Sequence, residues 1–414
     1  MALVEAFQSF DMSDTTVWFG VLTEANDNLI EVTAGARVGQ YIGNFSYGTD
    51  AVFGQVTEVR EEFNGSLVYR VSDMSLDAFE VFQAVDSGDT AALQRLALSG
   101  ADRIIGSGMA DYLIAYAGND TISSGGGDDS IQASEGTDII DGGAGTDILF
   151  LVGNQSEYTL TLQAGSTRLE DRVPNGLGVN YVENIERLDF EQNFGGQPWF
   201  DLASFSGLLR VSQPELESFI ELYIAYFNRA PDAVGLNFWG TSFSNGITLS
   251  EIAALFSNQV ETLSVYPQGT SNETFATTVY NNVLGRTPDQ SGISFWVEAL
   301  DSGNVSRDQF ILEVLQGAKA ALKPEQGQAF VDQQIADRAY LETKTDIGEY
   351  FSVHKGMSNV QHARTVMELY DGTAAGTQNA VDATFNFHQA ALDAFNGEFL
   401  MPIVGLIENP FEIA

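Results

Sequence analysis

The sequence contains 414 residues, with 57 acidic against 18 basic side chains, a formal net charge of −39 and no cysteine. So many carboxylates repel phosphate groups, which argues against nucleic acid or an anionic membrane surface as a partner and favours cations. The lack of cysteine excludes disulfide scaffolds, thiolate metal sites and thiol catalysis, and leaves metals that prefer oxygen ligands. Hydrophobic residues make up 44% of the chain, which is enough for several packed domains.

The sequence predicts neither a membrane span nor a cleaved export signal. The first residues lack the positively charged and apolar segments of a secretory signal. The longest aliphatic and aromatic run, residues 148–152, is far shorter than the ~18 apolar residues that a transmembrane helix needs. Any export is therefore expected to use another route.

Residues 1–98 are expected to form a β-rich cap or domain. Apolar and polar residues alternate over 52–59 and 66–71, which predicts strands, whereas 76–85 and 89–98 have helical periodicity. No catalytic constellation is visible in this region. It serves either as a cap for the segment that follows or as an independent effector or ligand-binding domain.

The centre of the chain, residues 99–150, repeats every nine residues. The period is carried by six aspartates: Asp102, Asp111, Asp120, Asp129, Asp138 and Asp147. A large aliphatic residue follows each aspartate by two positions, and glycine precedes five of the six by two positions, among them Gly118, Gly127, Gly136 and Gly145. Glycine permits the positive φ of a tight turn and the aliphatic side chain points into a core, so each unit predicts a turn followed by a short strand.

This pattern resembles the RTX, or hemolysin-type, calcium-binding nonapeptide repeat, and residues 142–150 are its cleanest unit. The resemblance implies a parallel β-roll in which two units complete one coil, so that each aspartate stacks over the one eighteen residues later. Carboxylates so close together repel each other, and Ca²⁺ completed by turn carbonyl oxygens converts the repulsion into attraction. The six aspartates and the four glycines are therefore the candidate calcium-site residues. The Asp102 and Asp111 units lack a Gly-Gly pair, and the Asp120 unit has Ala115-Tyr116 in its place. The first two coils are therefore expected to bind weakly or to act as a cap, and we expect two to four ions.

Residues 151–208 are predicted to cover the open end of the roll with β structure. Strand-like alternation occurs over 158–162, 181–185 and 188–190. The stretch resembles the capping segment that often follows RTX repeats. A coil needs such a cover because its last strand has an unpaired edge.

Residues 209–325 have helical periodicity and repeat at an offset of 57. The pattern Tyr-x5-Arg-x-Pro-Asp-x2-Gly-x2-Phe-Trp occurs at 223–239 and again at 280–296. Each copy predicts a helix, an Arg-x-Pro-Asp turn, a helix with the tryptophan, and a further helix that starts at a capping box, Thr248 to Glu251 or Ser306 to Gln309. The motif resembles domain of unknown function 4214, found in bacterial exoproteins and surface-layer proteins.

The tryptophan and arginine of the two copies allow two interpretations. These residues are Trp239 with Arg229 and Trp296 with Arg286. They could form a platform on which glycans stack and hydrogen-bond. Alternatively they belong to the core, with Asp232 and Asp289 as helix N-caps that also pair with the arginines. The helical spacing favours the core interpretation.

Residues 326–414 are expected to be a helical extension that ends in an export signal. The three histidines, His354, His362 and His388, are expected at the surface. The sequence contains no metalloprotease, serine-hydrolase or phosphate-loop motif. We therefore do not expect an enzyme.

The expected fold is multi-domain β plus α: a parallel β-roll with β-rich caps, followed by an all-α helical repeat domain. The composition and the repeats are similar to those of type I secretion substrates, which implies a bacterial protein that Ca²⁺ folds after export, outside the cell or at its surface. The main hypothesis is an adhesin or a surface-layer-like structural protein whose helical domain attaches to surface polysaccharide or self-assembles. Two alternatives stay open: a secreted effector or hydrolase with its active site in residues 1–98, and a carbohydrate-binding module exported for matrix retention.

Overall fold

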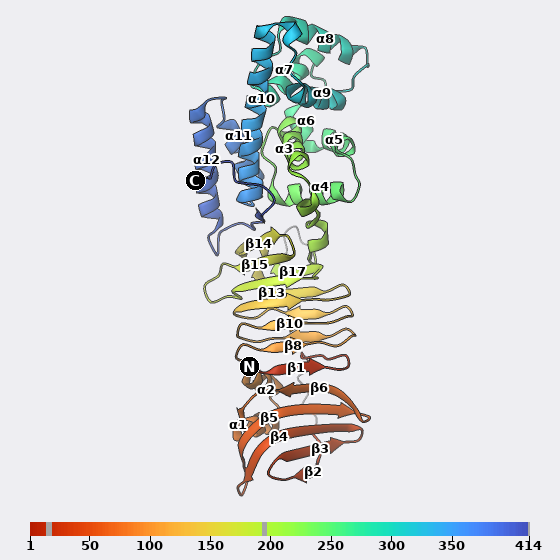
Figure 1. The fold of residues 1–414 in the computed structure, drawn as a ribbon, viewed down its shortest axis with the longest axis vertical. Helices are drawn as coiled ribbons and strands as arrows, with labels where there is room; N and C mark the ends of the chain where they lie inside the picture. Colours follow the sequence, from red (N-terminus) through yellow and green to blue (C-terminus); the bar gives the residue numbers. More distant parts are fainter. Residues whose placement is uncertain (14–18, 193–196, 413–414) are drawn as a thin grey trace. The chain divides into compact units, whose positions relative to one another are not determined.

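The computed structural model describes residues 1–13, 19–192 and 197–412 (Figure 1). The chain forms two compact units: a β unit, residues 1–159 and 165–203, and a helical unit, residues 160–164 and 204–414. The β unit is built on a large mixed sheet with many parallel strands, and helices dominate the helical unit. A β region followed by a helical region confirms the predicted fold class at this level.

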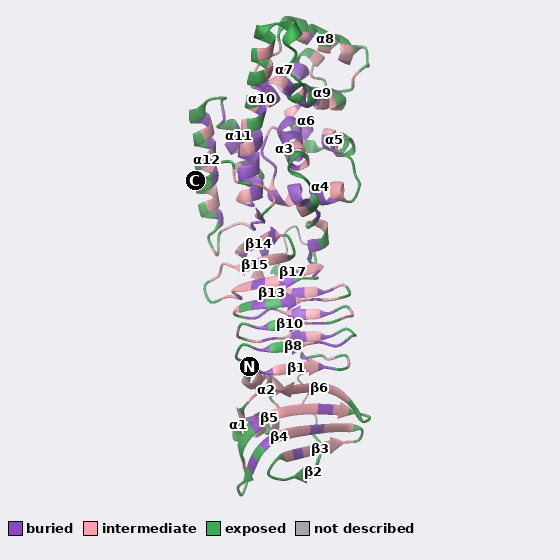
Figure 2. Ribbon diagram, viewed as in Figure 1, coloured by how far each residue is buried: buried purple, intermediate pink, exposed green. Residues whose placement is uncertain are grey.

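Short parallel strands form two ladders in the repeat region (Figure 1). One ladder contains β8 (Arg103–Ile105), β10 (Thr121–Ser123) and β12 (Thr137–Asp141), and the other contains β9 (Tyr112–Ile114), β11 (Ser130–Gln132) and β13 (Ile148–Asn154). The chain alternates between the ladders, so each strand pairs with the strand two units later, as the repeat predicts. Buried positions recur along the strands of the repeat region (Figure 2). The aliphatic residue of each unit is buried: Ile104 aligns with Ile122 and Ile140, and none of the three is more than 1% exposed.

Both ladders extend beyond residues 99–150, the predicted limits of the roll. β16 (Val179–Glu183) pairs in parallel with β12, and β17 (Arg187–Gln192) pairs in parallel with β13. At the opposite end, β1 (Leu3–Ala6) pairs in parallel with β8. The nine-residue period does not reveal these strands because long intervening segments shift them out of register. They cover strand edges that would otherwise stay unpaired.

The region after the repeats contains the β structure that the alternation predicts. Between β13 and β16 lie the 3₁₀-helix η1 (Gln155–Glu157), β14 (Tyr158–Gln163) and β15 (Ser166–Asp171), and β15 pairs antiparallel with β16. After β17 come β18 (Phe200–Asp201), which pairs antiparallel with it, and the 3₁₀-helix η3 (Leu202–Ser204). The strands predicted at 158–162, 181–185 and 188–190 are present with shifts of one or two residues.

The N-terminal part of the β unit is an antiparallel sheet packed against a helix. Its strands are β2 (Val21–Ala25), β3 (Leu29–Ala34), β4 (Arg37–Tyr47), β5 (Val52–Phe63), β6 (Ser66–Ser72) and β7 (Leu76–Asp77), and β6 also pairs antiparallel with β1. Val56 of the sheet and Val81 of α1 (Ala78–Ser87) are buried in one hydrophobic cluster. Helix α1 starts two residues later than predicted because Asp77 caps it, and α2 (Thr90–Ala97) starts after the cap Asp89.

Two helical repeats follow in the predicted order. The first contains η4 (Gly207–Arg210), α3 (Gln213–Phe227), α4 (Ala233–Ser244) and α5 (Leu249–Ser257), and the second contains α7 (Asn272–Leu284), α8 (Gln290–Asp301) and α9 (Arg307–Lys319), with α6 (Val260–Val265) between them. Asp232 and Asp289 cap α4 and α8, each accepting a hydrogen bond at 2.7 Å from the N–H of the glycine three residues later. Both predicted capping boxes are present.

The C-terminal part of the helical unit combines three helices with a strand. It contains the 3₁₀-helix η5 (Pro324–Gln326), α10 (Gln328–Glu349), the π-helix η6 (Tyr350–His354), α11 (Val360–Glu368), α12 (Ala374–Ala391) and β19 (Ile403–Val404). The sequence predicts helix remnants in this tail, but the tail forms a strand because β14 offers it an edge: Leu160 N–H donates to Leu400 O at 2.8 Å and Leu162 N–H donates to Pro402 O at 2.9 Å. Among the helices within the described residues, none is long and apolar enough to cross a membrane.

Candidate metal-binding site

The six aspartates predicted as ligands lie in two columns, each just before a strand of the ladders. Because the strands pair in 18-residue register, Asp102, Asp120 and Asp138 align in one column, and Asp111, Asp129 and Asp147 align in the other. All six are buried, and none is more than 5% exposed. The structure therefore brings the predicted aspartates together in the predicted pairs.

One carboxylate oxygen of each aspartate is bound to the backbone of the neighbouring coil. The N–H groups of Asp102, Asp111 and Asp129 each donate to Oδ1 of the aspartate eighteen residues later at 2.8 Å, and the N–H of Asp120 does so at 2.9 Å. At the start of the columns, the N–H of Ala2 donates to Asp102 Oδ1 and the N–H of Phe10 donates to Asp111 Oδ1. The aspartates are thus structural links between coils as well as charged groups.

Among the described residues, the second carboxylate oxygen has no hydrogen-bond partner at four of the six positions. These oxygens are Oδ2 of Asp102, Asp120, Asp129 and Asp147, and all four are buried. The other two are satisfied, because Asp111 Oδ2 accepts from Ser107 N–H at 2.6 Å and Asp138 Oδ2 accepts from Ser134 Oγ at 3.3 Å. Leaving a buried acceptor unsatisfied costs ~1–3 kcal/mol, and more when the group is charged. A positively charged ligand would satisfy these oxygens.

The electrostatics of the columns point the same way. Burial, together with the neighbouring carboxylates Asp138 and Asp102, raises the pKa of Asp120 to about 7, although the hydrogen bond from Asp102 N–H lowers it. Burial also raises the pKa values of Asp138 and Asp147 to about 6 and raises the pKa of Asp129. A bound cation would reverse these shifts, since an opposite charge nearby favours the ionised carboxylate.

The predicted glycines form turns in which successive coils approach closely. Gly118, Gly127, Gly136 and Gly145 all have positive φ. A Cβ on Gly136 would lie 1.6 Å from the carbonyl oxygen of Gly118, and a Cβ on Gly145 would lie 1.8 Å from that of Gly127. No larger residue fits at these two positions. The turns consequently stack closely on one another, and a Cβ on Gly118 would lie 3.0 Å from Asp120 Oδ1.

The available donors fit a calcium ion. Within the described residues no group of three or more Asp, Glu or His side chains could hold a metal by itself. An ion in the columns would combine carboxylate oxygens with other oxygen ligands, such as the backbone carbonyl oxygens of the turns. Ca²⁺ accepts six to eight such oxygen ligands in flexible geometry, whereas Mg²⁺ demands a near-ideal octahedron and keeps several waters.

Two polar residues continue the columns and escaped the sequence analysis. Asn180 aligns with Asp138 and is fully buried. Glu186 precedes Arg187, which aligns with Ile148, and Glu186 Oε2 accepts from the N–H of Asp147 at 2.8 Å. The insertion after β13 places Glu186 39 residues beyond Asp147, so a search at a nine-residue period ends at Asp147. Asn180 and Glu186 could have been predicted from one signal: a polar Asn or Glu at or directly before the start of a strand in the predicted cap.

The tryptophan and arginine set of the helical unit is built into its packing. Arg229 is 4% exposed, and its guanidinium lies 2.7 Å from Glu261 and 3.2 Å from Asp232. The predicted pairing with the N-cap aspartate thus holds in the first copy. In the second copy Arg286 pairs instead with Asp337 of α10 at 2.6 Å, a partner too distant in sequence to predict.

The tryptophans stand edge-on to buried phenylalanines. The ring of Trp239 is 5.4 Å from that of Phe256, and the ring of Trp296 is 4.9 Å from that of Phe310. Trp296 Nε1 donates to Tyr280 Oη at 2.9 Å. These contacts support the core interpretation over a glycan platform.

The histidines are not simple surface residues, contrary to expectation. All three are half-buried. His354 Nε2 lies 3.2 Å from Glu349 Oε1, and the ring of His362 stacks on Phe387 at 4.0 Å. A carboxylate neighbour of His354 and an aromatic neighbour of His362 cover these two rings, which helical periodicity alone does not reveal.

Comparisons with known proteins agree with this geometry. The model of the RTX calcium-binding nonapeptide repeat matches residues 97–131 and 123–151, and the model of domain of unknown function DUF4214 matches residues 253–321. Neither family model describes a catalytic domain. No curated protein matches this chain.

Among solved structures, the chain is similar to extracellular lipase LipA from Serratia marcescens, with 24% sequence identity and a TM-score of 0.22. The match covers 25% of this chain and 16% of the lipase chain, so it supports no conclusion about fold or activity. The two family models carry the assignment. The chain contains RTX repeats, which bind Ca²⁺ and are typical of secreted proteins, and a DUF4214 domain.

Proposed function

We propose that this protein is a secreted or cell-surface structural protein whose repeat region is a parallel β-roll folded by Ca²⁺. The observation that supports the proposal is the set of four buried Oδ2 atoms for which the described part of the chain supplies no hydrogen-bond partner, in columns beside the glycine turns. A single cation that accepts many oxygen ligands can bind several of these carboxylate oxygens at once. Without a cation, each oxygen would need its own hydrogen-bond donor.

The aspartates of the two columns would supply the carboxylate ligands, and the turns around Gly118, Gly127, Gly136 and Gly145 would supply carbonyl ligands. Each Oδ1 already holds the backbone of the adjacent coil, so an ion at Oδ2 would bind to a carboxylate that is fixed in position. Ca²⁺ would supply positive charge to the columns and no chemical step. Its role is therefore that of a folding switch rather than of a catalytic cofactor.

The switch suits export through a type I secretion machinery. In the cytosol Ca²⁺ is scarce, so the buried carboxylates of the columns oppose folding and leave the repeat region suited to threading. Outside the cell Ca²⁺ is abundant, and its binding free energy becomes folding free energy. Folding on the outer side would then oppose return of the chain.

The helical unit would supply attachment to a cell surface or to other protein molecules. Its tryptophans and arginines are engaged in internal contacts. Attachment would therefore use other faces of the repeats, and a face of α8 is considered below.

The test is calcium titration of the full chain after chelator treatment. Isothermal calorimetry measures the binding, and circular dichroism in the same buffer measures the change in secondary structure. We expect two or more sites, with a gain of β signal on binding. The double variant Asp120→Ala/Asp138→Ala should weaken binding and reduce the gain of β signal. The matched control, Asp86→Ala/Glu325→Ala, removes two exposed carboxylates outside the columns and should behave as the parent.

A parallel titration with Mg²⁺ separates a specific site from simple screening of negative charge. We expect Mg²⁺ at equal concentration to produce little β signal, because the turns do not enforce octahedral geometry. If no calcium binds up to several millimolar, or if Mg²⁺ acts as well as Ca²⁺, the proposed switch is wrong.

A further inference from the structure

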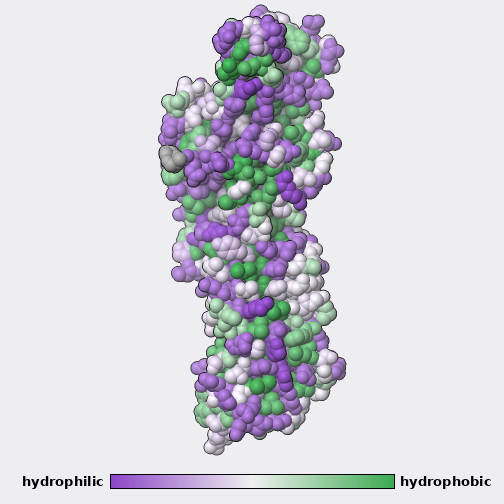
Figure 3. All heavy atoms as spheres, in the orientation of Figure 1, coloured by the Kyte–Doolittle hydropathy of each residue, from purple (hydrophilic) through white to green (hydrophobic). Residues whose placement is uncertain are grey.

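The two helical repeats differ in one respect: a face that is covered in the first repeat is open in the second. Helices α4 and α8 correspond residue by residue at the offset of 57. Figure 3 shows hydrophobic and hydrophilic side chains interspersed on the face in view, so hydropathy does not single out a docking surface there. The comparison of the two repeats does single one out.

In the first repeat the 3₁₀-helix η4 covers α4. Gly207 N–H donates to Thr241 Oγ1 at 2.9 Å, and Arg210 Nη2 donates to Ser244 Oγ at 3.1 Å. Leu208 packs directly on Gly240, where a Cβ would lie only 2.2 Å from its side chain. The segment thus contacts α4 through a backbone donor, an apolar side chain and a guanidinium.

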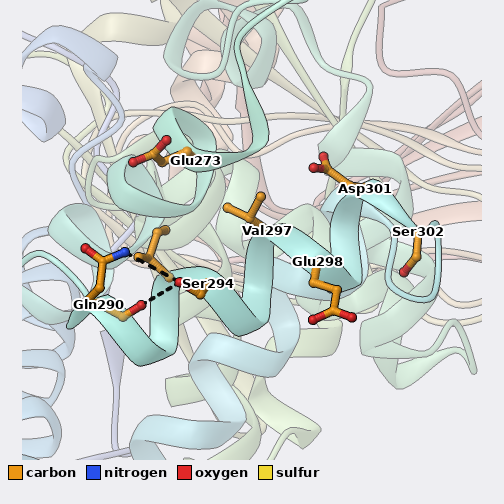
Figure 4. A pocket seen from close by; sticks show the side chains of 8 residues that line it. Glu273, Gln290, Ser294, Val297, Glu298, Asp301 and Ser302 are labelled. Carbon is orange, nitrogen blue, oxygen red and sulfur yellow. Dashed lines mark hydrogen bonds between the residues drawn. The ribbon is translucent and has the colours of Figure 1, made fainter.

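In the second repeat the corresponding face of α8 is hollow. The hollow has a volume of about 650 Å³ and is lined by Glu273, Gln290, Ser294, Val297, Glu298 and Asp301, among others (Figure 4). Glu298 and Asp301 occupy the positions of Thr241 and Ser244 and are exposed, whereas Thr241 is 4% exposed.

The chain of the second repeat cannot cover this face with its own lead-in segment. The residues that correspond to η4 at the offset of 57, residues 264–267, are held elsewhere: Tyr266 Oη donates to Ala225 O of α3 at 2.6 Å. Just after them, Thr270 O accepts from Arg307 Nη2. In the first repeat the corresponding residues form η4, which covers α4 and is followed directly by α3. The linker between the repeats therefore leaves α8 open.

The residues that line the open face have changed in a consistent direction. Thr241, Ser244 and Leu216 of the first repeat are replaced by Glu298, Asp301 and Glu273 in the second. Asp301 Oδ1 accepts from Asn272 Nδ2 at 2.7 Å, which fixes this carboxylate at the C-terminal end of α8. Where Arg210 meets a hydroxyl, the second repeat would offer a carboxylate, which binds a guanidinium more strongly.

One replacement restricts the shape of the occupant. Val297 stands where Gly240 makes room for Leu208. A leucine at that position of a bound segment would collide with the valine side chain. The occupant must have a smaller residue there.

We propose that this open face of α8 binds a short basic segment of a partner protein, in the manner in which η4 covers α4. The segment has glycine, a small residue, an apolar residue and an arginine in succession. Its glycine N–H donates to Glu298, its small residue faces Val297, and its arginine pairs with Asp301. The inference rests on the proposed attachment role of the helical unit but not on the calcium site.

The test uses a labelled peptide with the sequence of residues 204–212 carrying Leu208→Ala, titrated with the full chain in Ca²⁺ and followed by fluorescence anisotropy. We expect saturable binding that weakens with salt. The double variant Glu298→Gln/Asp301→Asn should lower the affinity about tenfold, as should Arg210→Gln in the peptide, which corresponds to ~1.4 kcal/mol for one charged pair. The control Glu313→Gln changes an exposed carboxylate on α9 and should leave the affinity unchanged.

The shape argument gives a reciprocal test. Val297→Gly should reverse the preference, so that the peptide with its natural leucine binds better than the Leu208→Ala peptide. Val297→Ala gives the same direction with less cost to the helix. Calcium calorimetry on these variants should match the parent, which keeps failure here distinct from failure of the calcium proposal.

Three results would overturn the inference. They are absence of saturable peptide binding, equal affinity of the parent and the Glu298→Gln/Asp301→Asn variant, and an unchanged peptide preference in both Val297 variants. If the parent chain self-associates in the absence of peptide and the Glu298→Gln/Asp301→Asn variant does not, the occupant is instead a second copy of this chain.

Discussion

Replacing Asp120 by asparagine should have opposite effects on stability with and without calcium. Asparagine keeps an Oδ1 that can accept the hydrogen bond from Asp102 N–H, now 2.8 Å long, but it carries no charge. The protein itself places asparagine, Asn180, at the corresponding position of a later strand in this column. Asp120→Asn therefore tests the charge of the carboxylate with little change in shape.

The sign follows from the pKa of Asp120. The folded chain without calcium raises this pKa from 3.8 to about 7, mainly through burial. The stabilising effect of the protonated carboxyl is therefore complete below about pH 4 and is lost as the pH rises through about 7. Holding the carboxylate ionised in the folded chain costs on the order of 2–4 kcal/mol, where the lower figure allows for solvent screening at the turn.

The assay is thermal or urea unfolding at pH 8, with a chelator and with excess Ca²⁺. With chelator, Asp120→Asn should be more stable than the parent by ~2 kcal/mol, because the buried charge is gone. With Ca²⁺ at one hundred times its dissociation constant the order should reverse, since loss of one occupied site removes ~2.7 kcal/mol, which exceeds the ~2 kcal/mol gained by removing the buried charge. A variant that is less stable under both conditions would refute the reasoning.

Three further substitutions test other parts of the structure. Gly136→Ala should destabilise the repeat region by more than ~2 kcal/mol in a urea titration, because Gly136 has positive φ and the added Cβ would lie 1.6 Å from a carbonyl oxygen. The control Gly108→Ala adds a Cβ that meets nothing within 4 Å, and it should cost less than ~0.5 kcal/mol in the same titration. Glu186→Ala leaves Asp147 N–H without its acceptor and should cost ~1–3 kcal/mol by chemical unfolding in Ca²⁺; an effect no larger than that of the exposed Glu183→Ala would contradict the assigned bond. Burial lowers the pKa of Lys344 from 10.5 to about 8, so the folded chain loses this proton at a lower pH than the unfolded chain does. The stability of the folded chain should therefore rise between about pH 8 and 10.5. Lys344→Met should flatten that rise in a pH series of unfolding curves.

The repeat was predictable because the geometry of one coil sets both the nine-residue spacing of the units and the eighteen-residue spacing of paired strands. A tight turn and a three-residue strand make nine residues, and pairing across two units brings aspartates eighteen residues apart into one column. The residues that complete the columns lie outside this period. Glu186 follows an insertion, and Ala2 reaches Asp102 across 100 residues of sequence.

In the helical unit the local signals were equally reliable. The N-caps Asp232 and Asp289 and both capping boxes follow from residues within four positions of one another. The partner of Arg286 does not, because Asp337 comes from a helix that packs against the repeat only in the folded chain. Local hydrogen bonds can thus be predicted from spacing, whereas tertiary ion pairs cannot.

The two ends of the aspartate columns are closed by protein groups in place of further repeats. At the N-terminal end the N–H groups of Ala2 and Phe10 occupy Oδ1 of Asp102 and Asp111, and Asp111 also has its Oδ2 satisfied by Ser107. The first unit pair is therefore held in part by the backbone of residues 2–10, consistent with its lack of the Gly-Gly signature. Among the described residues, three of the four later carboxylates, Asp120, Asp129 and Asp147, keep a buried oxygen without a partner, against Asp102 alone in the first pair, so the need for a cation falls mainly on the later units. Calcium affinity should consequently be strongest where the nonapeptide is most complete, and β1 should remain paired with β6 when the ions are removed.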